Sequence, residues 1–282
     1  MREITDGAAL ARGTRMVQLV ARSVKGTLLF LRWSEARHLW DLLADALGSA
    51  NSLMLMPDHV HAIVKDKPAP FGRALAAYAR WRNAARGENG PVWRRTPAPQ
   101  AFQDAAHARR AVRYQALNPC RKGIVADPLA WTFSTHRECV GLTLTPIRSR
   151  VSDAVAHHAY VSGDPSVDVA GTELPVRRAS TPGERELEAV TSELLRVPLA
   201  DLRNERDARR LLIQLARDWA GWGPGRAAEF CGVDPSTVWR APQLGRDAER
   251  LAATVVGDPR FPGLDDGDLR RLPGWGVYRS RR

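Results

Sequence analysis

The stretch SLMLMPDHVHAIVK, residues 52–65, decides the fold of the first half of the chain. Two runs rich in aliphatic residues, 52–56 and 59–65, flank Pro57-Asp58, a dipeptide typical of a turn. We therefore expect two strands that fold back on each other. Side chains two residues apart in a strand point to the same face. His59 and His61 would then lie together and could bind one metal ion, although a solvated strand face would also accommodate both.

The neighbouring segments predict further strands and helices around this hairpin. β-branched and aliphatic residues predict a first strand at 16–24, and residues 28–31 extend the β region. Glycine and proline make 87–99 a loop or a short strand. The predicted helices are 34–47, with Ser34 as N-cap, then 70–86, and 105–118, which Pro119 is expected to end. The pattern predicts an α+β domain.

Charge points to nucleic acid. The 282-residue chain has a formal net charge of +11, carried by 38 Arg and 4 Lys against 31 acidic residues. Such an excess attracts polyanions, and arginine forks match phosphate geometry, although ribosomal and membrane-surface proteins would show the same excess as DNA-binding proteins. No apolar run approaches the ~20 residues that cross a bilayer, and the N-terminal residues lack the apolar core of a secretory signal. We expect a cytoplasmic, nucleoid-associated protein without membrane contact, in which Cys120, Cys139 and Cys231 are free thiols.

A second set of candidate residues lies on the predicted helix 105–118. Tyr114 and Asn118 are four residues apart and can share one helical face. A tyrosine hydroxyl beside basic side chains, here Arg110 and Arg113, can act as a nucleophile. An amide oxygen is a suitable ligand for Mg²⁺ or Mn²⁺. Taken singly, Tyr114 could be a packed aromatic residue and Asn118 the end of a helix.

The ordered blocks MPDHVH (56–61), YQALNP (114–119) and GIVADPLAWTFS (123–134) resemble the REP-associated tyrosine transposases. These belong to the single-tyrosine superfamily named HUH after its two histidines, and the resemblance covers residues 10–145. It implies a ferredoxin-like catalytic domain in which His59, His61 and Asn118 hold Mg²⁺ or Mn²⁺. Tyr114 would cut single-stranded, hairpin-bearing DNA through a 5′-phosphotyrosine, with Arg110 and Arg113 contacting the DNA. The chain departs from the family at Ala116, where a histidine is usual, and in the segments 21–26 and 90–102.

The region 185–240 carries a different signal. Residues 225–231, Gly232 and residues 235–240 fit a helix, a tight turn and a second helix, with Asp234 as N-cap. This region resembles the DNA-binding domain of the replication initiator DnaA at residues 197–203, 208–210, 216–217 and 234–238, although Pro235 stands where the initiator usually has a histidine. Ser236, Thr237 and Arg240 would then reach phosphates or base edges of duplex DNA. An ordinary helical bundle is the alternative.

The predicted organisation is a catalytic domain at 1–150, a linker at 151–181, a helix-turn-helix domain at 182–258, and a basic irregular tail at 259–282. We expect helices at 184–195, 207–219, 225–231 and 235–240. The expected function is metal-dependent cleavage and transfer of single-stranded DNA by a monomer or homodimer. The alternatives are a regulator that binds DNA without cutting it, and a replication or plasmid-transfer relative of the same superfamily.

Overall fold

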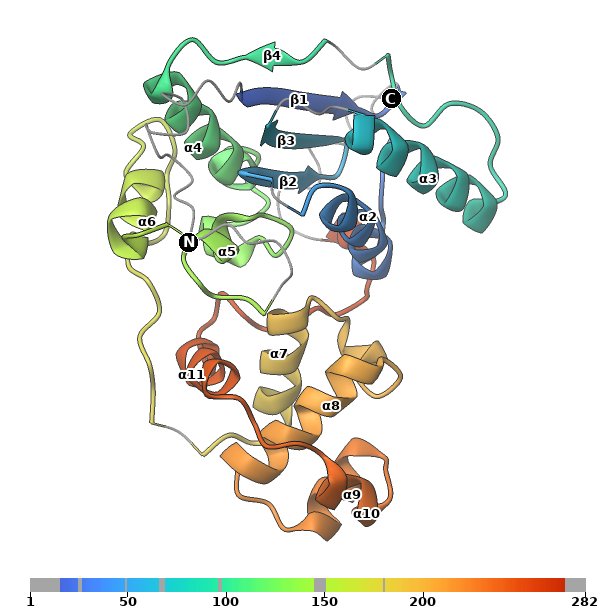
Figure 1. The fold of residues 1–282 in the computed structure, drawn as a ribbon, viewed down its shortest axis with the longest axis vertical. Coiled ribbons are helices and arrows are strands. Elements are labelled where there is room, and N and C mark those ends of the chain that lie inside the picture. The colour runs from blue at the N-terminus through green and yellow to red at the C-terminus, as the bar shows by residue number, and fades with distance from the viewer. Residues whose placement is uncertain are drawn as a thin grey trace. The chain divides into compact units, whose positions relative to one another are not determined.

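A computed structural model describes residues 16–24, 27–48, 50–65, 69–95, 98–144, 151–179 and 181–271. The chain divides into two compact units. The first comprises residues 1–141, 146–173 and 268–282, and the second comprises 142–145 and 174–267. The start of the predicted domain 1–150 (residues 1–15), residues 145–150, and residues 272–282 of the predicted tail lie outside the described residues. Figure 1 shows the sheet of the first unit and the helices of the second.

The first unit contains a four-stranded antiparallel sheet of order β2-β3-β1-β4. This order, with a helix between β1 and β2 and another between β3 and β4, is that of a ferredoxin-like βαββαβ arrangement. The α+β prediction is confirmed. The strands are β1 (Met16–Arg22), β2 (Ser52–Met56), β3 (His59–Lys65) and β4 (Gln100–Ala101).

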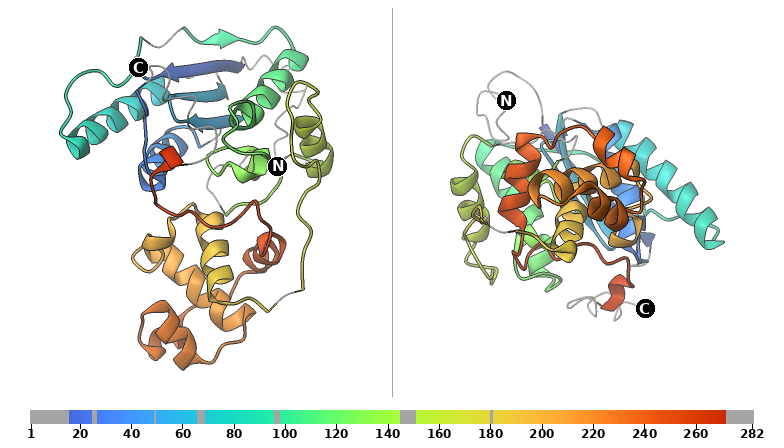
Figure 2. Two further views of the ribbon diagram at one scale, coloured as in Figure 1. Left: turned by 180° about the vertical axis from the view of Figure 1, so that it is seen from behind. Right: turned by 90° about the horizontal axis from the view of Figure 1, so that it is seen from below.

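The two faces of this sheet pack against different side chains. On one face Val60 and Ala62 of β3 pair with Leu55 and Leu53 of β2, and all four side chains are fully buried. On the other face Ile63 packs against Val112 of helix α4 (Ala105–Arg121). Figure 2 shows α4 and α3 (Ala69–Arg86) on opposite sides of the strands. A one-residue shift of β3 would exchange its two faces, so burial fixes the histidine face towards α4.

Helices α2 (Trp33–Ala46) and α3 pack on each other and fix the loop before α2. The predicted strand extension at 28–31 is wrong, because the Leu29 carbonyl accepts a hydrogen bond from the buried Tyr78 hydroxyl (2.7 Å) and not from a strand. The predicted N-cap is also wrong. Helix α2 begins one residue before Ser34, and the Glu35 carboxylate accepts the Leu31 N–H at 2.6 Å, which fixes the chain before the first turn.

Helix α4 continues past Pro119, against prediction. Asp104 caps its start by accepting the His107 N–H at 2.6 Å. A proline lacks its own N–H and removes one bond of the helix, but the next donors find acceptors. Lys122 N–H bonds to the Asn118 carbonyl (3.2 Å) and Ile124 N–H to the Pro119 carbonyl (3.0 Å). Asn118 therefore lies inside the helix.

The segment 151–181, predicted as a linker without a helix, contains α6 (Ala154–Ser162). Asp153 caps it through the Ala156 N–H at 2.9 Å. Val161 is fully buried in a cluster with Ala116 and Leu117 of α4. Helix α6 is short and its apolar residues do not form a stripe, which explains why periodicity missed it. Between α4 and α6 lie η2 (Pro128–Ala130) and α5 (His136–Cys139).

The second unit is built from helices, four of them at the predicted places. Helix α11 (Arg246–Val255) was not predicted, and it buries Leu251, Ala252 and Val255. Phe261 and Leu264, from the predicted irregular tail, are also buried, and the Leu264 carbonyl accepts the Leu199 N–H at 2.9 Å. The elements are α7 (Glu184–Leu195), η3 (Leu199–Asp201), α8 (Arg206–Gln214), η4 (Leu215–Trp219), α9 (Pro224–Cys231), α10 (Pro235–Arg240) and α11 (Arg246–Val255). The short η5 (Leu269–Arg271) belongs to the first unit.

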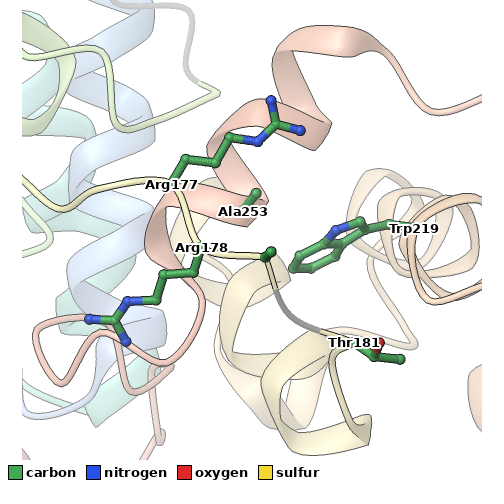
Figure 3. Close-up of a pocket in the computed structure, with 6 residues that line it drawn as sticks. Arg177, Arg178, Thr181, Trp219 and Ala253 are labelled. Carbon is green, nitrogen blue, oxygen red and sulfur yellow. The ribbon is translucent and has the colours of Figure 1, made fainter.

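A pocket of about 690 Å³ lies within the second unit (Figure 3). Its two arginines point apart and already have protein partners. Arg178 donates to the Gly257 carbonyl at 2.8 Å, and Arg177 lies 3.7 Å from the Glu249 carboxylate. These contacts tie the segment before α7 to α11. The lining residues are Arg177, Arg178, Ala179, Thr181, Trp219 and Ala253.

Three histidines form a cluster between α5 and α6 in the first unit. The Nε2 atom of His136 lies 3.0 Å from Nδ1 of His158, and the His136 and His157 ring centroids are 5.4 Å apart. Burial lowers the pKa of His136 well below its usual value and the pKa of His157 to about 4, with the neighbouring imidazoles acting in the same direction. The fold therefore favours the neutral form of His136 and His157.

This cluster should make the stability of the protein depend on pH. An unfolded histidine with a pKa near 6.5 binds a proton more readily than folded His157, whose pKa is about 4. Its contribution is complete above pH 6.5 and is lost as the pH falls towards 4. With these two pKa values, wild type should lose about 2 kcal/mol of unfolding free energy through His157 between pH 7 and pH 5, a loss that His157→Gln should not show. Urea denaturation in EDTA at each pH measures the unfolding free energy, and His107→Gln is the control. A difference between His157→Gln and wild type that does not change with pH would contradict the prediction.

The three cysteines are free thiols, as expected. Across the described helices, no stretch combines the length and the apolar character that crossing a bilayer requires.

Candidate active site

The alternation of β3 and the position of α4 bring three side chains to one point. His59 and His61 extend from β3 towards the helix, and their ring centroids are 4.7 Å apart. Asn118 meets them from α4, with its Nδ2 atom 3.1 Å from His59 Nε2 and 3.3 Å from His61 Nε2. All three residues are almost completely buried. The structure therefore brings together the strand pair and the helix residue that the family resemblance assigns to one site.

The surroundings of the histidines direct their ring nitrogens. The Asp58 carboxylate lies 2.5 Å from His59 Nδ1, where it can accept a ring N–H, and His59 Nε2 faces the Asn118 amide. Burial lowers the pKa of His61 to about 3, assisted by the nearby His59 and Arg22 and opposed by Asp58. A neutral imidazole is the form that binds metal ions. Asp58, the sequence neighbour of His59, has the carboxylate–histidine relation that orients metal ligands.

These residues fit a divalent metal ion. Two imidazole Nε2 atoms and one amide converge, and a half-turn of the Asn118 amide would present its oxygen in place of its nitrogen. Two nitrogens and one oxygen suit Mn²⁺, and Mg²⁺ less well because it prefers oxygen ligands. Within the ranges described, His, Cys, Asp and Glu form no metal-binding group of three or more, so the amide would have to be the third ligand. Three protein ligands would leave positions open for substrate oxygens.

Tyr114 lies beside this group and faces solvent. Its ring centroid is 6.3 Å from that of His61, and 46% of the residue is exposed. The guanidinium carbon of Arg121, two turns along α4, lies 5.0 Å from the centre of the Tyr114 ring. A large exposed aromatic side chain beside buried metal-type ligands is accessible to an external substrate. The arrangement can bring a phosphodiester to a hydroxyl.

The two predicted DNA-binding arginines of α4 differ in their surroundings. Arg110 is exposed one turn before Tyr114. Arg113 is partly buried: its Nε lies 3.4 Å from Asp164, and its guanidinium lies over the Tyr160 ring at 4.7 Å. Three charged residues near the site were not predicted from the sequence: Asp58, Arg121 and Asp164. Asp58 and Arg121 could have been found from their spacing to His59 and Tyr114, whereas no local pattern marks Asp164.

The predicted residues of the second unit lie on α10, after a turn at Gly232 with a φ of 66° that favours glycine. Asp234 caps α10 through the Ser236 N–H at 2.8 Å. Ser236 and Arg240 are exposed, and Arg240 Nη2 donates to Ser236 Oγ at 2.8 Å. Thr237 is partly exposed, and Trp239 between them is 71% exposed. The helix thus presents a polar face with one large aromatic side chain.

No protein-family model and no curated protein matches the chain. Among solved structures, it is similar to a REP-associated tyrosine transposase bound to a REP hairpin, with a TM-score of 0.36. The two sequences are 21% identical, and the match covers 50% of this chain and 86% of that chain. Similarity at this level does not establish a shared activity.

Proposed function

We propose that this protein cuts and rejoins single-stranded DNA with Tyr114 as the nucleophile and Mn²⁺ or Mg²⁺ as the cofactor. The observation that carries the proposal is the meeting of His59, His61 and Asn118 beside the exposed hydroxyl-bearing ring of Tyr114. Buried neutral ligands next to an accessible nucleophile are the parts that metal-assisted phosphoryl transfer needs. The net charge of +11 favours DNA as the phosphodiester substrate.

The reaction needs no external energy source. The Tyr114 oxygen attacks phosphorus, the new O–P bond forms, and the bond from phosphorus to the 3′ oxygen breaks. The tyrosine proton is lost and the departing 3′ oxygen gains one, which leaves a 5′-phosphotyrosine and a free 3′-hydroxyl. A bound divalent metal ion would supply Lewis-acid polarisation of the phosphate. A second 3′-hydroxyl can reverse the step and join strands, because the phosphotyrosine conserves the phosphodiester energy.

The chain's own residues supply position and orientation. His59 and His61 direct their Nε2 atoms to one point, burial keeps the His61 ring neutral, and the Asp58 carboxylate would orient the His59 ring through Nδ1. Helix α4 carries both Tyr114 and Asn118, so the nucleophile and the amide keep a fixed spacing. Arg110 and Arg113 lie on the same helix as donors for phosphates next to the cut.

A denaturing gel tests this function directly. The protein is incubated with labelled single strands from the DNA flanking its own gene, some with hairpins, in Mn²⁺, in Mg²⁺ and in EDTA. We expect a metal-dependent, covalently shifted band, and peptide mapping should find the nucleotides on Tyr114. An adduct on another residue, or no adduct with any strand, would contradict the proposal. If no adduct forms and EDTA does not change DNA binding, the protein would instead be a DNA-binding regulator.

We further propose that α9 and α10 form a helix-turn-helix module that binds duplex DNA, with Ser236, Thr237 and Arg240 on the contacting face. Support comes from the tight turn at Gly232, the cap at Asp234 and the exposed polar side chains of α10. A module of this kind would hold the catalytic unit near its site and raise the local concentration of DNA.

Removing the charge of Arg240 should weaken this duplex binding. We expect Arg240→Gln to lose about tenfold in affinity for duplex made from the flanking DNA. The slope of log affinity against log salt concentration should become shallower by about 1. Fluorescence anisotropy at several salt concentrations measures both. The matched control is Arg185→Gln on α7, an exposed arginine of the same unit. Equal losses for the two variants would mean that binding follows net charge alone.

A further inference from the structure

Arg121 lies on the same face of α4 as the candidate site. Tyr114, Asn118 and Arg121 are spaced by four and three residues, the spacing of neighbours along one helical face. The guanidinium carbon of Arg121 is 5.0 Å from the centre of the Tyr114 ring. This cation is therefore within reach of a phosphate placed for attack by Tyr114.

Asp164 fixes the direction of the Arg121 side chain. Its Oδ2 accepts from Arg121 Nη2 at 2.9 Å and lies 3.4 Å from Arg113 Nε. Its Oδ1 accepts from the backbone N–H of Ser166 at 3.0 Å and from the Ser166 hydroxyl at 2.7 Å. These two bonds from Ser166, with the two arginines, hold the pKa of Asp164 below its usual range. Asp164 is thus an ionised carboxylate in a fixed turn after α6.

Arg121 keeps the capacity to bind a second anion. A guanidinium presents five N–H groups in a planar fork, and the bond to Asp164 uses Nη2. The Arg121 side chain is 26% exposed, whereas that of Asp164 is 10% exposed. The Arg121 side chain therefore keeps more contact with solvent than the carboxylate that it binds.

We propose that Arg121 is a catalytic residue that binds a non-bridging oxygen of the phosphate attacked by Tyr114, and that Asp164 is its positioning residue. This inference rests on the proposed function and adds a protein cation to it. Negative charge spreads over the non-bridging oxygens as the O–P bond to Tyr114 forms and the bond to the 3′ oxygen breaks. A guanidinium fixed in advance stabilises that charge without having to reorganise.

The competing explanation is structural, since an ion pair from α4 to Asp164 would also hold α6 in place. The two explanations differ in rate and in additivity. A structural role predicts weaker folding and independent effects of the two residues. A catalytic role predicts slower chemistry on bound DNA, and a loss at Asp164 that disappears once Arg121 is gone.

The experiment is single-turnover adduct formation at saturating single-stranded DNA in Mn²⁺, with DNA affinity and circular dichroism measured in parallel. We expect Arg121→Gln to slow the step about 100-fold, Arg121→Lys to restore part of it, and Asp164→Asn to slow it about tenfold. DNA affinity should change less than about threefold. In the Arg121→Gln background, Asp164→Asn should have no further effect. The control is Arg109→Gln, which removes an exposed charge from the same helix.

Each outcome has a distinct meaning. If wild type forms an adduct and Arg121→Gln forms it at the wild-type rate, the inference is overturned and the proposed function stands. Additive effects of the two substitutions overturn the positioning role of Asp164. If wild type forms no adduct with any strand, both the proposed function and the inference are overturned.

Discussion

Tyr114→Phe is expected to abolish the covalent adduct with single-stranded DNA, with a loss of at least about 1,000-fold in rate. The substitution removes one oxygen, the atom that would form the bond to phosphorus. The side chain is 46% exposed, so the loss of its hydroxyl should change the unfolding free energy by less than about 0.5 kcal/mol. DNA affinity should stay within about twofold, since the ring and the neighbouring arginines remain.

The measurement is adduct yield on a denaturing gel, with affinity measured by anisotropy under the same conditions. Tyr160→Phe is the matched control, because Tyr160 is also exposed in the first unit, at 38%. This control should form adduct at the wild-type rate. Adduct that persists in Tyr114→Phe would assign the nucleophile elsewhere, and equal losses in both variants would indicate a general effect on the fold.

His61→Ala is expected to cost at least about 100-fold in Mn²⁺ affinity and about 1,000-fold in adduct formation. In the proposed site, this change would leave only His59 and Asn118 as protein ligands, which cannot by themselves hold an ion tightly. His61 is buried and its low pKa, about 3, keeps the ring neutral. It therefore contributes a lone pair, which alanine lacks. Asp58→Asn should show a smaller loss of about 10- to 100-fold, because it acts on the orientation of His59.

Calorimetric titration with Mn²⁺ alone measures this effect without any reaction. The control is His107→Ala, at the start of α4 and outside the ligand group. Unchanged Mn²⁺ affinity in His61→Ala would remove the metal site from the proposal. A loss of adduct with unchanged metal affinity would instead assign His61 a role in binding DNA.

The sequence by itself determined the parts of the candidate site that depend on local periodicity. The spacing of His59 and His61 fixes a shared strand face, because strand side chains alternate. The spacing of Tyr114 and Asn118 fixes a shared helix face, because a helix turns once in 3.6 residues. The turn at Pro57-Asp58 also follows from local residue types, as do the four helices predicted between residues 184 and 240, the last two of which flank Gly232. These features need no knowledge of distant contacts.

Only the tertiary structure decided which faces meet and what surrounds them. The 3.1 Å approach of Asn118 to His59 joins residues 59 positions apart, and packing of Ile63 on Val112 creates it. Residues 117–119 are buried where α4 continues through Pro119. Asp164 reaches Arg121 because the burial of Val161 against Leu117 places α6 beside α4. Such long-range pairs leave no periodic signal in the sequence, since burial and charge pairing select them only once the chain has folded.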